Sequence, residues 1–200
     1  MMNIKRFNTI YSTKRNVEIT SVMKKAQSFT KNVKNMYINA IGAVAILFED
    51  GSVKTAGNRS YGGDSSSIAS DLDGTIPVTA IYSNSRAFAA LRNDGSVVTW
   101  GYSSWGGDSS SVASKINGTI PVTAIYSNSS DYRGAFAALR SDGSVVTWGD
   151  PENGGDSSEV EEDINGDIDV TSIFATHDGF IAKRSDGKIF TWSGTWKLKF

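Results

Sequence analysis

The chain has 200 residues, of which 39% are hydrophobic, and a net charge of −1. This is enough to bury one sizeable core or one stack of small repeating cores, so one folded unit is expected. The sequence contains no cysteine, which excludes disulfides, thiol catalysis and cysteine-ligated zinc. No apolar run suits a membrane span or a secretory signal. We therefore expect a cytoplasmic protein, or one exported by a non-Sec route, that does not enter a membrane.

Charge divides the chain at Lys31. Residues 1–31 carry seven Lys or Arg and one Glu, which leaves 13 basic and 20 acidic residues in 32–200. The acidic body argues against nucleic-acid binding. The basic leader, 1–31, is predicted to be either a targeting segment or a segment that docks on the body. Its strand-like part runs from Val17 to Val22, although the region of Lys24 and Lys25 could equally be helical.

The rest of the chain is a tandem repeat. The run AFAALRNDGSVVTWG, Ala87 to Gly101, returns almost unchanged from Ala135 to Gly149, and weaker copies span Val44 to Gly57 and Gly179 to Ser193. A fixed period identifies an architecture before any single residue is interpreted. The sequence predicts four repeats, which divide residues 32–200 into 32–77, 78–121, 122–169 and 170–200.

Each repeat contains the signals of three strands. In the second copy these are the runs Val78 to Tyr82 and Ala87 to Leu91, and a third run that ends at Trp100. The pair Asp94-Gly95 separates the last two and predicts a hairpin, because both residue types tolerate positive φ. The mixed small and large apolar residues of the second run predict a strand that is buried on both faces.

A Gly-Gly-Asp-Ser-Ser motif follows each of the first three hairpins. It begins at Gly62, Gly106 and Gly154. Asp or Ser can accept hydrogen bonds from the free N–H groups at a helix start, so one or two helical turns are expected here. Asp156 and Glu159 have the spacing of a capping box. After the fourth hairpin, Trp196, Leu198 and Phe200 alternate with polar residues and predict an additional strand.

This repeat resembles that of the regulator of chromosome condensation family. The shared pattern is a small apolar run, Asp-Gly, a strand that ends in Trp-Gly, and a glycine-bearing loop, and it covers residues 33–192. The resemblance implies an all-β fold, a small β-propeller-like array of four repeats with a short helical turn after each hairpin. The Gly-Gly-Asp-Ser-Ser loop marks a variant subfamily. Three closures are open: a four-bladed ring, an arc capped by the leader, and a homo-oligomer that completes the ring.

The residues offer little for catalysis. His177 is the single histidine, and it is expected to be structural, because the usual nucleophile and base pairs need partners that the sequence lacks. The loop carboxylates could hold calcium or an anion, but helix capping explains them without a ligand. We therefore predict no enzyme activity, no catalytic residue, no metal and no cofactor.

Variable loop residues are the candidate binding site. Scaffold positions of a repeat stay constant while binding loops diverge. Aromatic residues precede the first two Gly-Gly pairs, the third copy carries Asn153 among acidic residues instead, and a four-residue insertion lengthens one loop of the third copy. For Trp105, packing between repeats is an equally weighted alternative. The predicted binding residues are Tyr61, Asp64, Tyr102, Trp105, Asp108, Tyr132, Arg133 and Asp156.

These features favour a protein-binding module, and one form of it is a bacterial effector whose loops bind a host or bacterial protein. The resemblance also implies a second function, guanine-nucleotide exchange on a small GTPase, although no stretch matches the family's exchange insertion. A third reading is a lectin, in which Tyr61 and Trp105 stack on sugars and Asp64 or Asp108 accept their hydroxyls.

Overall fold

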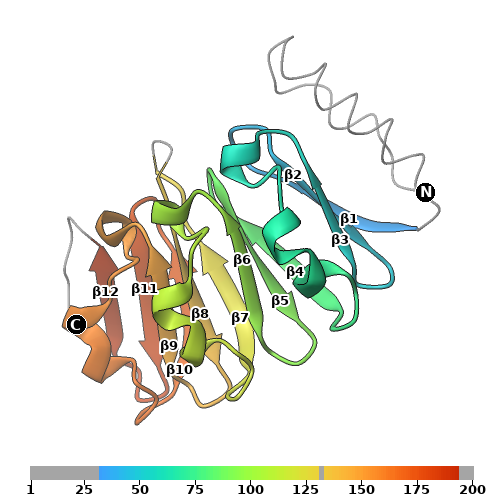
Figure 1. Ribbon diagram of the computed structural model, residues 1–200. Coiled ribbons are helices and arrows are strands. Elements are labelled where there is room, and N and C mark those ends of the chain that lie inside the picture. The colour runs from blue at the N-terminus through green and yellow to red at the C-terminus, as the bar shows by residue number, and fades with distance from the viewer. Residues whose placement is uncertain (1–31, 131–132, 194–200) are drawn as a thin grey trace.

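The computed structural model describes residues 32–130 and 133–193, which form four three-stranded antiparallel sheets (Figure 1). Each sheet, or blade, takes its strands in chain order, so every repeat of the sequence makes one sheet. The strands are β1 (Val33–Ile38), β2 (Val44–Phe48) and β3 (Val53–Ala56) in blade 1, β4 (Val78–Ser83), β5 (Ala87–Arg92) and β6 (Val97–Gly101) in blade 2, β7 (Val122–Ser127), β8 (Ala135–Arg140) and β9 (Val145–Gly149) in blade 3, and β10 (Val170–Ala175), β11 (Gly179–Arg184) and β12 (Ile189–Ser193) in blade 4.

The Asp-Gly pairs form hairpin turns, as predicted. The glycine has positive φ, for example +79° at Gly95. Gly95 N–H donates to Arg92 O at 3.0 Å, and Asp94 Oδ1 accepts hydrogen bonds from the backbone N–H and the hydroxyl of Ser96 at 2.9 and 2.6 Å. These bonds close a three-residue loop with glycine at its left-handed position.

The middle strands of blades 1 to 3 are buried on both faces, which confirms the prediction from their mixed apolar residues, whereas β11 of blade 4 leaves Lys183 exposed. In β5, Phe88 and Ala90 belong to the hydrophobic cluster between blades 1 and 2, whereas Ala87 and Ala89 belong to the cluster between blades 2 and 3. All four are fully buried. The core is therefore a series of clusters between successive sheets, as expected for stacked repeats.

The loops after the hairpins contain helical turns, as predicted, and these are 3-10 helices. Their start is capped by the aspartate of Gly-Gly-Asp-Ser-Ser, which lies one residue before the formal cap position. In blade 1, Asp64 Oδ1 accepts a hydrogen bond from Ser66 N–H at 3.0 Å. The turns span Arg59–Tyr61 and Ser66–Leu72 after β3, Ser103–Trp105 and Ser110–Lys115 after β6, and Pro151–Asn153 and Ser158–Asp163 after β9.

A tryptophan near the end of β6, β9 and β12 joins its blade to the loop of the preceding blade. The indole Nε1 of Trp100 donates to Gly62 O at 3.1 Å, and its ring stacks on Phe88 at 5.2 Å. Gly62 lies against the Phe88 ring so closely that a Cβ atom would approach it to 2.7 Å. The bond recurs between Trp148 and Gly106 at 3.2 Å. It also recurs from Trp192 to Gly154 O at 3.1 Å. These three tryptophans therefore pack between successive blades.

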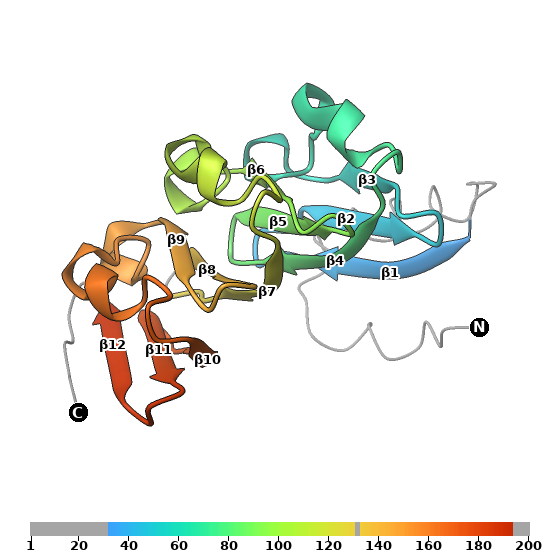
Figure 2. The same cartoon turned by 90° about the horizontal axis from the view of Figure 1, so that it is seen from below.

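The blades follow one another in an open arc within the described residues (Figures 1 and 2), with β1 to β3 at one end and β10 to β12 at the other. A compact four-bladed ring is therefore not formed. Phe174 of blade 4 is 59% exposed. Its counterparts Tyr82 and Tyr126 pack against the cluster that their blade shares with the following blade, whereas no blade follows blade 4 within the described residues. The predicted leader and the strand predicted at Trp196 to Phe200 lie outside the described residues. No helix of the described part is both long and apolar enough to cross a membrane.

Replacing Trp148 by Phe tests the inter-blade bond. The variant keeps an aromatic ring on Phe136 but leaves the buried carbonyl of Gly106 without its donor, so unfolding free energy should fall by about 1–3 kcal/mol. Trp105→Phe is the matched control, because the indole of Trp105 is not part of this bond, and it should change stability by less than about 0.5 kcal/mol. Urea denaturation of both variants measures the difference. Equal losses of unfolding free energy in the two variants would show that the Trp148–Gly106 hydrogen bond does not stabilise the contact between blades 2 and 3.

Candidate functional site

The loops at one end of blades 1 to 3 are held by a repeated asparagine. Asn84, at the end of β4, donates from Nδ2 to Trp105 O at 2.6 Å and accepts from Ala87 N–H at 2.9 Å. Asn39 holds Tyr61 O in the same way, at 2.7 Å, and Asn128 holds the carbonyl of residue 153, also at 2.7 Å. The backbone of the variable loop position is thus fixed in all three blades while its side chain changes from Tyr to Trp to Asn.

Three of the predicted binding residues come together around an arginine. The Arg86 guanidinium lies 4.6 Å from the centre of the Tyr61 ring and 4.2 Å from that of Trp105, and Nη1 donates to the Tyr61 hydroxyl at 3.2 Å. Tyr102 lies beside both rings, at 4.6 Å from Trp105 and 5.9 Å from Tyr61. We call Tyr61, Arg86, Tyr102 and Trp105 the aromatic–arginine cluster.

The cluster spans two blades and is open to solvent. Tyr61 comes from the loop of blade 1, whereas Tyr102 and Trp105 come from that of blade 2 and Arg86 from the turn between β4 and β5. Tyr102 is 38% exposed. Stacking on two rings pre-orders the arginine, since a guanidinium is attracted to aromatic faces. Such a surface offers flat apolar area together with a fixed positive charge.

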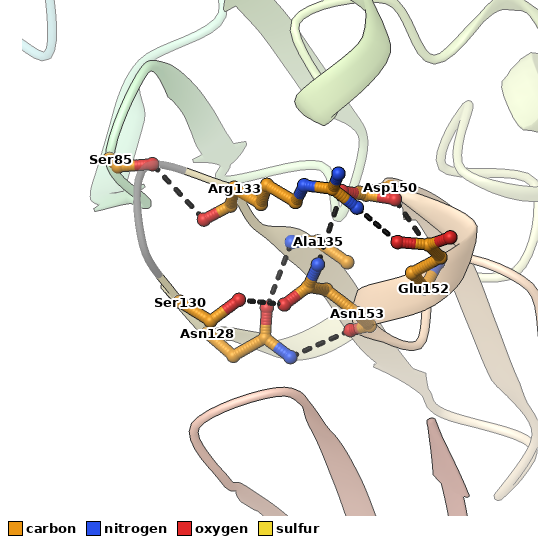
Figure 3. A network of polar contacts seen from close by, with 8 residues as sticks. All are labelled: Ser85, Asn128, Ser130, Arg133, Ala135, Asp150, Glu152 and Asn153. Atoms are coloured by element: carbon orange, nitrogen blue, oxygen red, sulfur yellow. Dashed lines mark hydrogen bonds and ion pairs between the residues drawn. The ribbon is translucent and has the colours of Figure 1, made fainter. Parts of the chain in front are cut away.

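A polar network takes the place of the aromatic residues at the next seam (Figure 3). Arg133 forms ion pairs with Glu152 and, at 3.7 Å, with Asp150, which is only 7% exposed. Asn153 donates from Nδ2 to Asp150 at 3.1 Å and accepts from the hydroxyl of Ser130. The predicted site residue Arg133 therefore lies in an acidic setting. Tyr132, predicted beside it, lies outside the described residues.

The predicted aspartates serve as helix caps. Asp108 and Asp156 accept from the N–H groups of Ser110 and Ser158, each at 2.9 Å, as Asp64 does from Ser66. Hydrogen bonds from the backbone and hydroxyl of Ser66, and the guanidinium of Arg59 at 2.7 Å, hold the pKa of Asp64 below its ordinary value. The bonds from Ser110 lower the pKa of Asp108 in the same way.

Two of these caps also border a groove between blades 1 and 2. The groove has a volume of about 550 Å³, and Asp64 and Asp108 line it together with Arg59, Asp71 and Arg92. Arg92 and Asp71 form an ion pair at 3.3 Å across it. The described site residues therefore divide among the cluster, the groove and the Arg133 network, with Asp156 serving as the cap of the third loop, and they do not form one site.

The described residues show no constellation typical of a metal site. No group of three or more His, Cys, Asp or Glu side chains within 32–130 and 133–193 could hold a metal ion. His177 is exposed in the turn between β10 and β11.

Sequence reasoning missed Arg86 and the three asparagines. The asparagines had a visible signal, since Tyr-Ser-Asn-Ser occurs at both 82–85 and 126–129. Arg86 had none, because it occupies a turn whose length differs between copies, and its partners come from two different repeats. Only the packing of the blades brings these residues together.

Comparison with solved structures agrees with this geometry. Human WBSCR16 matches with a TM-score of 0.51 and 18% identity over 84% of this chain and 49% of its own. Prp20p from Saccharomyces cerevisiae, studied for its binding to Gsp1p and histones, matches with a TM-score of 0.52 and 16% identity over 80% and 44%. Yeast RCC1 (Prp20) bound to Kap60 matches with a TM-score of 0.50 and 14% identity over 80% and 43%.

The fold is that of an RCC1-like β-propeller. The chain spans about half the length of these structures. No family model matches the sequence, and no curated protein matches it. The fold prediction is therefore confirmed, while the variant subfamily stays a prediction.

Acidification tests the capping aspartates. A carboxylate with a lowered folded pKa stabilises the fold above its ordinary pKa, and that contribution is lost as the pH falls below about 4 through the lowered value. The double variant Asp64→Asn/Asp108→Asn can still accept the capping bonds but carries no charge there. Its melting temperature should be lower than that of wild type near pH 6 and fall less on going to about pH 3, where the two should converge. Identical acid profiles would contradict the role of these charges.

Proposed function

We propose that the chain is a non-catalytic protein-binding module whose contact surface is the aromatic–arginine cluster. The observation that carries this proposal is the placement of Tyr61, Tyr102 and Trp105 around Arg86 on loops whose backbone is fixed by Asn39 and Asn84. Tyr, Trp and Arg are the residues that most often dominate binding energy at protein interfaces. A rigid frame also lowers the entropy lost on binding.

The acidic surface beside the cluster narrows the partner's chemistry. Glu152 is exposed, with 70% of its side chain accessible, and it lies next to Arg133 on the loop of blade 3. A partner that contacts both seams needs an apolar or acidic group opposite Arg86 and a basic group opposite Glu152. Complementary charges of this kind set orientation and speed of association.

Related folds support a protein partner. Prp20p was studied for its binding to Gsp1p and histones, and yeast RCC1 (Prp20) has been seen bound to Kap60. We further propose that the partner is a host or bacterial protein bound by an effector. This is tested by affinity capture from eukaryotic and bacterial lysates in parallel, followed by identification of the captured protein and titration with the purified partner.

The Tyr102→Ala variant tests the binding surface. Loss of an exposed interface aromatic should weaken binding of the identified partner roughly tenfold or more, with little change in melting temperature. Phe174→Ala is the matched control, because Phe174 is an exposed aromatic residue on β10 of blade 4, and its affinity should equal that of wild type. If Tyr102→Ala binds as tightly as the control, the cluster is not the contact surface.

Nucleotide exchange is the alternative proposal, motivated by the similarity to Prp20p. Release of a fluorescent guanine nucleotide from a panel of small GTPases measures it directly. Acceleration by wild type would establish exchange, and its loss in Arg86→Gln would place it at the cluster. A glycan array tests the lectin hypothesis. That hypothesis needs Trp105 and Asp108 to contact the same sugar, but Trp105 lies in the cluster and Asp108 lines the groove.

A further inference from the structure

The outer face of blade 1 differs from the corresponding faces of the other blades. Strand β2 directs Val44, Ile46 and Phe48 away from blade 2, and they form a separate hydrophobic cluster. The described apolar side chains packed on it, Met36 and Ile38, come from the same sheet. Even so, Val44, Ile46 and Phe48 are each no more than 2% exposed.

In blades 2 to 4 the residues at these positions face the preceding blade and pack against it. Blade 2 has Phe88, Ala90 and Arg92 there; Phe88 packs against Gly62 of blade 1 and Arg92 pairs with Asp71 at 3.3 Å. Blade 1 has Phe48 where the arginine stands and Ala56 where the inter-blade tryptophan stands. Apart from Lys54 of β3, which stands opposite Ile46 and is exposed, its outer face is therefore apolar, and it lacks every group that binds a Gly-Gly loop.

The segment immediately before β1 has a complementary pattern. Within 17–29, apolar residues recur at the spacing of one helix face, Ile19, Val22, Met23, Ala26 and Phe29, which is typical of an amphipathic helix. Lys24, Lys25 and Ser21 fall outside this stripe. Three residues, 30–32, separate the segment from Val33, the first residue of β1, so it enters the fold at the edge of the sheet that it would cover.

We propose that residues 17–29 form a helix whose apolar stripe packs on the outer face of blade 1 and closes this end of the arc. Stacked repeats need a terminal unit with a polar outer surface, because an open end otherwise presents apolar area and invites association. The lysines of the segment supply that polar surface. The leader then replaces the missing preceding blade, so it is an integral part of the fold.

The opposite end of the arc makes a second copy a poor occupant of the same face. A head-to-tail copy would place the outer face of its blade 4 on Val44, Ile46 and Phe48. Lys183 of β11 stands on that face, at the position that Leu91 occupies in blade 2. Burying an ammonium group against apolar side chains without a partner is costly.

Disulfide trapping tests the proposal in the full chain, whose lack of cysteine makes every introduced pair unique. Met36→Cys is combined in turn with Val22→Cys, Met23→Cys or Ala26→Cys on the stripe, and with Ser21→Cys as the control on the other face. We expect an intramolecular disulfide from at least one stripe pair and at least tenfold less from the control. Equal trapping on both faces, or disulfide-linked dimers alone, would overturn the proposal, and dimers would favour the second copy.

Melting temperature provides an independent readout. Val22→Asp/Met23→Asp places two charges in the apolar contact and should lower the melting temperature of the full chain by about 5 °C or more. The matched variant Ser21→Asp/Ser28→Asp adds the same charge to the polar side and should shift it by less than about 2 °C. Similar shifts in the two variants would show that the stripe makes no buried contact.

Discussion

Two successive carbonyl groups in each loop are held by two different blades, and the array depends on this. In the first loop, Asn39 of blade 1 binds Tyr61 O, and Trp100 of blade 2 binds the next carbonyl, Gly62 O. The same two bonds occur at the next two seams. Because these groups are buried, each loop must lie in one place before the following sheet can pack. The blade spacing and the position of the variable side chains are thus set together.

This arrangement explains which repeat positions are constant. The glycine after the variable residue has left-handed φ and touches the phenylalanine of the next blade, with no room for a side chain. The variable residue itself has only its carbonyl fixed. Tyr61, Trp105 and Asn153 can therefore differ without disturbing the frame, which is the condition under which a repeat protein can alter its surface and keep its fold.

The sequence predicted what is local and repeated. Asp94-Gly95, the alternation around Phe88 and the Trp-Gly ends located every described strand, because a hairpin and a buried strand depend on neighbouring residues. It did not predict Arg86 between Tyr61 and Trp105, since that contact joins three separate segments. The roles within the hairpin turn also came from the structure, where Asp94 accepts hydrogen bonds from Ser96 and Gly95 takes the left-handed conformation.

The ion pairs between successive blades differ from one pair of blades to the next. Asp71 and Asp163 each pair with an arginine of the following blade, Arg92 and Arg184, but Lys115 stands at the equivalent position between blades 2 and 3. Arg140 pairs with Asp142 of its own hairpin instead. Lys115 itself pairs with Glu161 of the next loop, at 3.8 Å, and both side chains are more than half exposed. The arginines of the outer seams are largely buried by comparison. Because salt screens exposed charges more than buried ones, raising the ionic strength should loosen the contact between blades 2 and 3 before the other two.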